Sequence, residues 1–133
     1  MIYLLDTNVC IHLLNEADPG IQQQFQRLGP GKIALCSIVK AELLFGAQRS
    51  ARVDANLQRL RFFFSPLQSL SFDDDCAEHY ALIRADLAAS GRPIGPNDLI
   101  IAAIARANGA VLVTHNQDEF GRVSGLHLED WET

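Results

Sequence analysis

Oxygen-bearing side chains stand at the ends of several predicted elements of this 133-residue chain. Asp6 closes a short apolar run, Glu42 lies inside a predicted helix, and Asp98 falls in the first turn of a long apolar helix. Asn116 and Glu119 follow the last fully apolar run. If the fold gathers these side chains at one place, they form a set of hard ligands for a cation.

Such a cluster would be electrostatically unfavourable without a cation. Three carboxylates at one place repel one another, and each raises the pKa of the others. The ligand atoms are oxygens, and no Cys or His pair stands near them, so the pattern indicates Mg²⁺ or Mn²⁺ rather than Zn²⁺. A cation held in this way supports in-line hydrolysis of a phosphodiester, because it activates water and stabilises the departing oxygen.

Each acidic residue also has a purely structural interpretation. Asp6 could cap the helix that follows it, and Asp98 could interact with a helix dipole. Glu42, with Gly46 and Arg49, could form an exposed stripe at helical spacing. The ligand interpretation is favoured only if the fold brings these side chains close together.

Short apolar runs alternate with longer helical patterns along the chain. The predicted strands are residues 2–5, 32–36, 67–72, 110–114 and a last edge strand at 126–128. The predicted helices are residues 9–15, 18–28, 38–48, 50–63, 73–90 and one that runs from Pro96 to a C-cap at Asn108. Ser37 is the expected N-cap of the third helix, and residues 115–120 are expected to form a polar turn.

This alternation predicts an α/β fold with a central, mostly parallel sheet between layers of helices, an α/β/α sandwich. Ligands of such sheets bind beyond the carboxyl ends of the strands. Asp6 and Thr114 both stand at such ends.

Composition favours one globular domain over residues 1–133, with 48% hydrophobic residues. The three cysteines are widely spaced in apolar runs, which indicates buried thiols in a reducing compartment. The apolar N-terminal run is too short for a signal peptide or a membrane span. We therefore expect a cytoplasmic protein with no membrane association.

The net charge of −5 argues against a general nucleic-acid coat, although it does not exclude an enzyme that acts on nucleic acid. The chain has no Gly-rich Walker loop and no Gly-x-Ser-x-Gly elbow. Its four histidines form no spacing typical of a catalytic triad.

Four motifs occur in one order: LLDTN at residues 4–8, SIVKAEL at 37–43, GRPIGPND at 91–98 and LVTHNQDEF at 112–120, with EDW at 129–131 after them. Together they resemble the PIN-domain ribonuclease toxins called VapC. The resemblance covers almost the whole chain. It implies a PIN fold, a homodimer, Mg²⁺-dependent endoribonuclease activity, and inhibition by a cognate VapB antitoxin that can join it in a hetero-oligomer.

The resemblance also assigns site residues. Asp6 and Asp98 match the family's likeliest direct metal ligands, and Glu42 matches a position that binds the metal or orients it through water. The fourth acidic position of PIN domains falls in the turn after Thr114, where this chain has Asn116 and, three residues on, Glu119. Both stay candidates, and an amide at this position makes a tightly held second metal doubtful. Mn²⁺ is expected to substitute for Mg²⁺.

VapC family members that have a Gly-Arg-Pro-Ile-Gly loop and a Thr-His-Asn turn are similar to toxins that cut initiator tRNA in its anticodon loop. The resemblance therefore implies a structured RNA substrate, which is recognised by shape and unstacked bases. Two alternatives remain at this point. One is a metal-dependent phosphatase with Asp6 as nucleophile, although such enzymes usually have an Asp where Asn8 stands. The other is a non-catalytic PIN module that binds RNA or protein.

Overall fold

Five short parallel strands form the centre of the molecule in the computed structural model, which describes residues 1–133. They are β1 (Tyr3–Leu5), β2 (Ile33–Cys36), β3 (Gln68–Leu70), β4 (Val111–Val113) and β5 (His127–Glu129). Their order in the sheet is β3-β2-β1-β4-β5, and every neighbouring pair is parallel. The predicted parallel sheet is confirmed: β1 to β4 are one to three residues shorter than the apolar runs suggested, and β5 is shifted by one residue.

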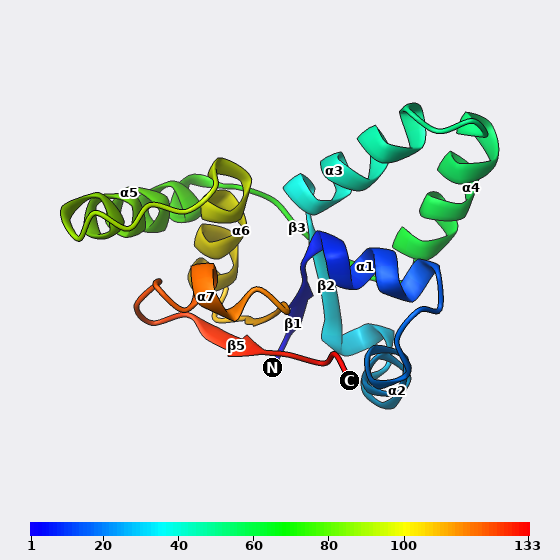
Figure 1. Ribbon diagram of the computed structural model, residues 1–133, viewed down its shortest axis with the longest axis horizontal. Helices are drawn as coiled ribbons and strands as arrows, with labels where there is room; N and C mark the ends of the chain where they lie inside the picture. Colours follow the sequence, from blue (N-terminus) through cyan, green and yellow to red (C-terminus); the bar gives the residue numbers. More distant parts are fainter.

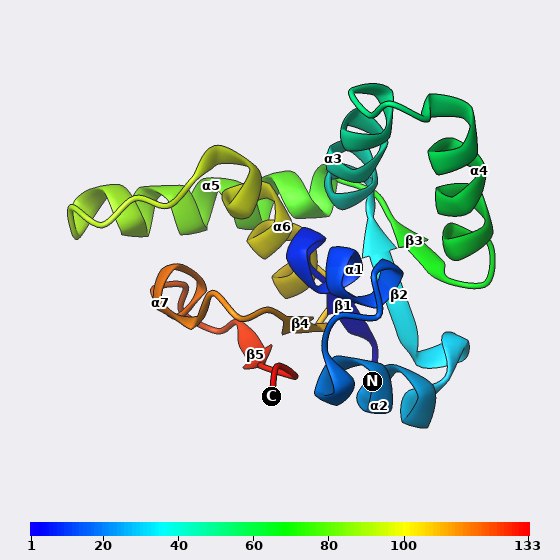
Figure 2. The same ribbon diagram turned by 45° about the vertical axis from the view of Figure 1, so that its right-hand side comes forward.

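Helices cover both sides of this sheet. They are α1 (Thr7–Leu14), α2 (Pro19–Leu28), α3 (Ser37–Gln48), α4 (Val53–Phe64), α5 (Asp74–Ala89), α6 (Pro96–Ala107) and α7 (Gln117–Phe120), with a 3-10 turn at Pro30–Lys32. Figures 1 and 2 both show α5 and α6 on one side of the sheet and α3 and α4 on the other. The predicted α/β/α layering is confirmed.

Capping residues explain where several helices begin. Asp18 accepts a hydrogen bond from the Ile21 N–H at 3.1 Å, and Pro19 takes the first helical position of α2. Asp73 caps α5 in the same way through the Cys76 N–H at 3.0 Å. Both starts agree with the sequence prediction.

Two local predictions are wrong. Ser37 is not an N-cap, because α3 starts directly where β2 ends, with Cys36 in the cap position and no side-chain cap bond. The stretch after β4 is not simply a polar turn. Asn116 accepts a hydrogen bond from the Glu119 N–H at 3.3 Å and thereby starts the short helix α7.

The core lies between the sheet and the helices, and α6 buries more residues than any other helix. All three cysteines are buried and free, as the sequence predicts. No helix combines the length and the apolar composition that crossing a membrane requires.

Strand register brings the first site residues together. Leu5 of β1 pairs with Val113 of β4, and the Asp6 N–H donates to the Val113 carbonyl at 3.1 Å. Asp6 and Thr114 therefore leave adjacent strands at the same edge of the sheet.

Candidate active site

Asp6 stands at the junction of β1 and α1. It is 8% exposed, and its Oδ1 accepts a hydrogen bond from the Val9 N–H at 2.9 Å. Burial raises the pKa of this carboxyl, while hydrogen bonds from Thr114 and from the Val9 N–H act in the opposite direction. Asp6 thus fills the capping role that the sequence allowed.

Glu42 reaches the same place from α3. Its Oε1 accepts a hydrogen bond from the Thr7 hydroxyl at 2.7 Å, and its Oε2 lies 3.5 Å from the Asn97 amide nitrogen. It is half-buried, so the exposed-stripe interpretation is wrong for this residue. The two hydrogen bonds orient its carboxylate toward the carboxyl edge of the sheet.

Asp98 lies in the first turn of α6. Its pKa is raised to about 6, first by burial and then by the neighbouring carboxylates Glu119, Glu42 and Asp6. A helix N-terminus favours an ionised acid, so the raised pKa means that burial and the neighbouring carboxylates together outweigh the helix dipole. Of Asp6, Asp98 and Glu119, Asp98 has the pKa that is raised most.

Glu119 and Asn116 complete the arrangement from α7. Glu119 Oε1 accepts from the Gly95 N–H at 2.9 Å, and its Oε2 accepts from the Asn116 amide at 2.8 Å. The Gly95 N–H and the Asn116 amide lower the pKa of Glu119. The Asn116 N–H in turn donates to the Thr114 hydroxyl at 3.0 Å. Glu119 is therefore an ionised carboxylate held in place on both oxygens.

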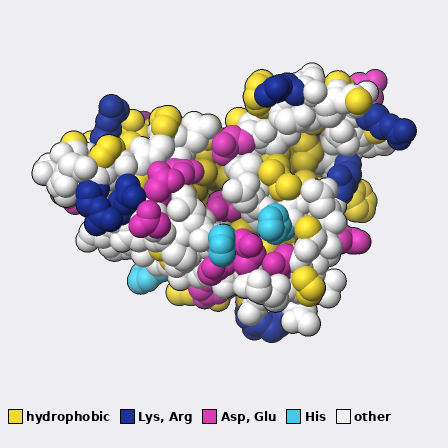
Figure 3. Space-filling model, viewed as in Figure 1, with side chains coloured by type: hydrophobic (Ala, Val, Ile, Leu, Met, Phe, Trp, Pro, Cys, Tyr) yellow, Lys and Arg dark blue, Asp and Glu magenta, His cyan; other side chains and the backbone are white.

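These residues surround one small cleft of about 150 Å³. Asp6, Glu42, Asp98 and Asn116 line it, and no Lys or Arg does. Glu119 lies beside Asp98 at its edge. Figure 3 shows acidic side chains gathered at the centre of this face of the molecule. The fold thus brings together all five residues that the sequence singled out.

Some supporting residues were not predicted. Asn97 contacts Glu42, Asn8 lines the cleft, and the Gly95 N–H fixes Glu119. Asn97 and Gly95 belong to the same loop motif as Asp98. The position of that motif, next to a predicted site residue, is the signal that could have pointed to them.

Comparison with known proteins shows the family of this chain. The family model of the PIN domain matches residues 3–126. The tRNA(fMet)-specific endonuclease VapC of Shigella flexneri is 40% identical over 129 residues, which are 97% of each chain. The chain belongs to the VapC family of PIN-domain proteins.

Solved structures of similar proteins share the whole fold. In the crystal structure of VapBC2 from Rickettsia felis bound to a DNA fragment from their promoter, the matching chain has a TM-score of 0.90 and 38% identity, with 99% of this chain and 100% of that one covered. The DNA-bound VapBC of Salmonella typhimurium gives a TM-score of 0.91 at 38% identity, with 98% of each chain covered. The VapC resemblance and the PIN fold predicted from sequence are confirmed.

The donor set of this PIN domain fits a divalent cation. Carboxylates from four different elements meet at a cleft with no basic side chain in its walls, and burial together with the neighbouring carboxylates raises the pKa of Asp98. PIN-domain ribonucleases are generally metal-dependent. Oxygen-only ligands of this kind suit a hard cation.

Proposed function

We propose that this chain is the toxin of a VapBC toxin–antitoxin system, a Mg²⁺-dependent endoribonuclease that blocks translation in the cytoplasm. Residues 1–133 act as one PIN domain. The observation that carries the proposal is the convergence of Asp6, Glu42, Asp98 and Glu119 on one cleft. The relatives named above as VapC endonucleases support it.

Each side chain has a distinct role in the proposed mechanism. Asp6 and Asp98 would hold Mg²⁺ directly, with Mn²⁺ able to substitute, and Glu42 and Glu119 would bind it or orient its water ligands. When bound, the ion supplies activation of water and stabilisation of the departing oxygen. Thr7 and Asn97 keep Glu42 in position, and burial of Asp6 excludes bulk water from one side of the cleft.

Initiator tRNA is the proposed substrate. VapC of Shigella flexneri and VapC of Salmonella typhimurium are both named tRNA(fMet)-specific endonucleases, and they are 40% and 39% identical to this chain. A net charge of −5 disfavours indiscriminate binding of RNA through its phosphates. Recognition of one folded RNA is consistent with that charge.

Cleavage assays with a panel of RNAs test the substrate. Initiator tRNA, an elongator tRNA and ribosomal RNA are each incubated with the purified chain in Mg²⁺, and the products are mapped. A single cut in the anticodon loop of initiator tRNA is expected. Cleavage of the other RNAs instead would refute the substrate, and cleavage of none would favour a module that only binds.

A VapB antitoxin is the proposed partner, because the similar structures are VapBC complexes. Beside the acidic cleft, an apolar groove of about 330 Å³ lies between α1, α3 and α4 and includes Ile11, Leu43, Leu60 and Glu42. Figure 3 shows hydrophobic side chains in this hollow next to the acidic centre. An apolar antitoxin segment seated there would border the catalytic carboxylates and could block access to them. We further propose that the toxin is a homodimer within this hetero-oligomer.

Ile11→Asp tests the groove, because Ile11 is 39% exposed and a charge there would not disturb the core. Burying an unpaired charge in the interface should weaken antitoxin binding by more than about 10-fold. Leu82→Asp on α5, outside the groove and 61% exposed, is the matched control. Equal binding by both variants, measured by calorimetry, would place the antitoxin elsewhere.

Mg²⁺ binding should depend on pH through Asp98. Its pKa of about 6 means that a proton competes with the ion below that value. We expect affinity to level off above about pH 7 and to fall about 10-fold per pH unit below 6, since one proton must leave for each ion bound. Calorimetric titration at several pH values measures this. An affinity that does not change between pH 5 and pH 7 would show that no group with a pKa near 6 has to lose a proton when the ion binds, and would contradict this competition at Asp98.

The fourth ligand position can be assigned by comparing two variants. Glu119→Gln keeps an acceptor for the Gly95 N–H but removes the charge, so Mg²⁺ affinity should fall about 10- to 100-fold. Asn116→Ala removes the α7 cap and one bond to Glu119, and a smaller loss is expected. A larger loss for Asn116→Ala would assign the position to Asn116.

The two alternative functions have less support. Asp6 Oδ1 accepts the Val9 N–H, and Asn8 stands where phosphatases of that kind usually carry a second Asp. A module that only binds would have no need of four converging carboxylates.

A further inference from the structure

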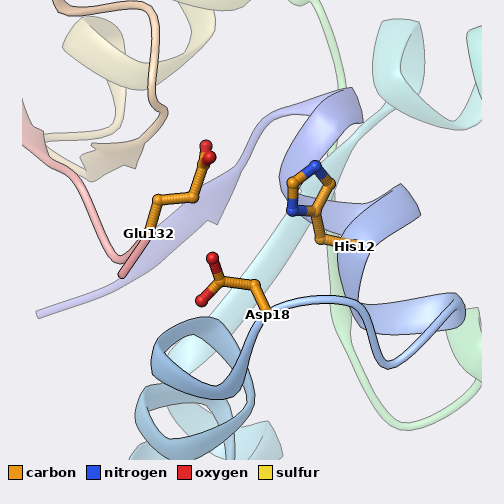
Figure 4. A group of neighbouring side chains, drawn as sticks. All are labelled: His12, Asp18 and Glu132. Carbon is orange, nitrogen blue, oxygen red and sulfur yellow. The ribbon is translucent and has the colours of Figure 1, made fainter.

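A second group of metal-ligating side chains lies outside the acidic cleft. It consists of His12 on α1, Asp18 at the N-cap of α2, and Glu132 in the segment after β5. One ligand atom from each lies within 4.8 Å of the other two. Figure 4 shows the imidazole ring and both carboxylates turned toward a common space.

The imidazole of His12 has an unsatisfied atom in this group. Its Nδ1 is shielded from solvent and has no hydrogen-bond partner. Buried polar atoms are nearly always partnered, so this nitrogen is open to a ligand that the chain itself does not supply. Figure 4 places the Nδ1 edge of the ring toward Asp18 and Glu132.

Asp18 provides a fixed, ionised carboxylate. Its Oδ1 accepts from the Ile21 N–H at 3.1 Å and from the Thr133 hydroxyl at 3.2 Å, whereas Oδ2 has only the Thr133 N–H at 3.2 Å. Burial raises the pKa of Asp18, but these hydrogen bonds outweigh it and hold the pKa below its usual value. Oδ2 thus has a lone pair free for a cation.

We propose that His12, Asp18 and Glu132 bind a transition-metal dication of the Zn²⁺ type, at a site separate from the acidic cleft. One imidazole nitrogen with two carboxylate oxygens suits Zn²⁺ better than Mg²⁺, which prefers oxygen ligands alone. Ligand atoms around tetrahedral Zn²⁺ lie about 3.4 Å apart, whereas these atoms lie within 4.8 Å of one another, so the group must close by at most about 1.4 Å. Glu132 can supply this movement through its flexible side chain.

Binding there would connect the two ends of the chain. The ion would tie the segment after β5 to α1 and α2, alongside the existing contacts between Thr133 and Asp18. His12 and Glu132 also line a wide polar hollow of about 510 Å³ together with Asp6. The ion would therefore neutralise a carboxylate that faces the same hollow as the proposed catalytic Asp6.

A neighbouring group offers a natural comparison. His115 also lies near Glu132, with Nδ1 at 3.3 Å from it, but that nitrogen already contacts Asp130 at 2.9 Å, and the side chain is 66% exposed. The Nδ1 atom of His115 therefore has a hydrogen-bond partner, whereas the Nδ1 atom of His12 has none.

Calorimetric titration with Zn²⁺ tests the site. It uses the 133-residue chain carrying Asp98→Asn, in millimolar Mg²⁺, to suppress binding in the acidic cleft. We expect one Zn²⁺ per chain and a rise in melting temperature on binding. No Zn²⁺ binding by the folded protein would overturn the proposal.

Matched variants locate the ion. Asp18→Asn keeps the helix cap but loses the charge, Glu132→Gln keeps the shape, and His12→Ala removes the nitrogen. Each should weaken Zn²⁺ binding by more than about 10-fold. His127→Ala, on the exposed edge strand β5, should bind as well as its parent. Binding that survives Asp18→Asn, or that is lost with His115→Ala, would overturn the assignment. Because the readout is Zn²⁺ binding, it is independent of RNA cleavage.

Discussion

The Asp98→Asn variant is expected to lose RNA cleavage by more than about 100-fold, because even partners of metal ligands contribute 10- to 100-fold. The same variant should be as stable as the wild type, or more so, in the absence of Mg²⁺. In the metal-free protein the carboxylates Glu119, Glu42 and Asp6 surround Asp98 and help to raise its pKa to about 6. A neutral amide removes that repulsion. Cleavage rates and thermal melting in EDTA measure the two effects.

The stability effect of Asp98 has a defined pH window. Its folded pKa of about 6 lies above the ordinary value of 3.8. The stabilisation from its protonated form is therefore complete below about pH 4 and is lost as the pH rises through 6. The melting temperature of Asp98→Asn should exceed that of the wild type above pH 6, and the difference should vanish near pH 4. A variant that melts well below the wild type at pH 7 would instead show that Asp98 stabilises the dipole of α6.

Asp6→Asn should also abolish cleavage, by more than about 100-fold, while the fold is retained. Asn caps a helix about as well as Asp, so the hydrogen bond from the Val9 N–H can persist without the charge. Asp6→Ala removes the cap as well and should lower the free energy of unfolding by about 1 kcal/mol. Denaturant unfolding separates the two variants.

Comparing these two variants separates the role of Asp6 in catalysis from its role in stabilising the fold. If Asp6→Asn cleaved RNA at the wild-type rate, Asp6 would be a helix cap and nothing more. If both variants were equally unstable, the contribution of Asp6 to stability would come from its charge rather than from the cap.

The sequence predicted the features that follow from local physics. Asp18 and Pro19 mark the start of α2 to the residue, because a cap and a fixed φ angle act within one turn. The uniformly apolar runs predicted a parallel sheet, and such a sheet places Asp6 and Thr114 at one edge. The meeting of Asp6 with Asp98 followed from the predicted topology and from the family resemblance.

Other features depend on contacts between distant residues. Nothing in the residues around 116–119 predicts that Glu119 accepts from the Gly95 N–H, because that bond joins α7 to the residue before α6, 24 residues earlier in the chain. Ser37 has the residue type of a cap, but the direct passage from β2 into α3 leaves it no capping position. The His12, Asp18 and Glu132 group depends on how the segment after β5 returns to α1 and α2, which no local pattern specifies.

Metal-dependent hydrolysis at the acidic cleft is tested most directly by the chemistry of the cut ends after cleavage of RNA in ¹⁸O-labelled water with Mg²⁺. Metal-dependent hydrolysis at the acidic cleft predicts a terminal phosphate that carries one ¹⁸O atom, no 2′,3′-cyclic phosphate, and no product in EDTA. Mass spectrometry of the fragments reads all three. A cyclic phosphate without label, formed equally well in EDTA, would mean that the RNA's own 2′-hydroxyl attacks, and the account of Asp6, Glu42, Asp98 and Glu119 would be wrong.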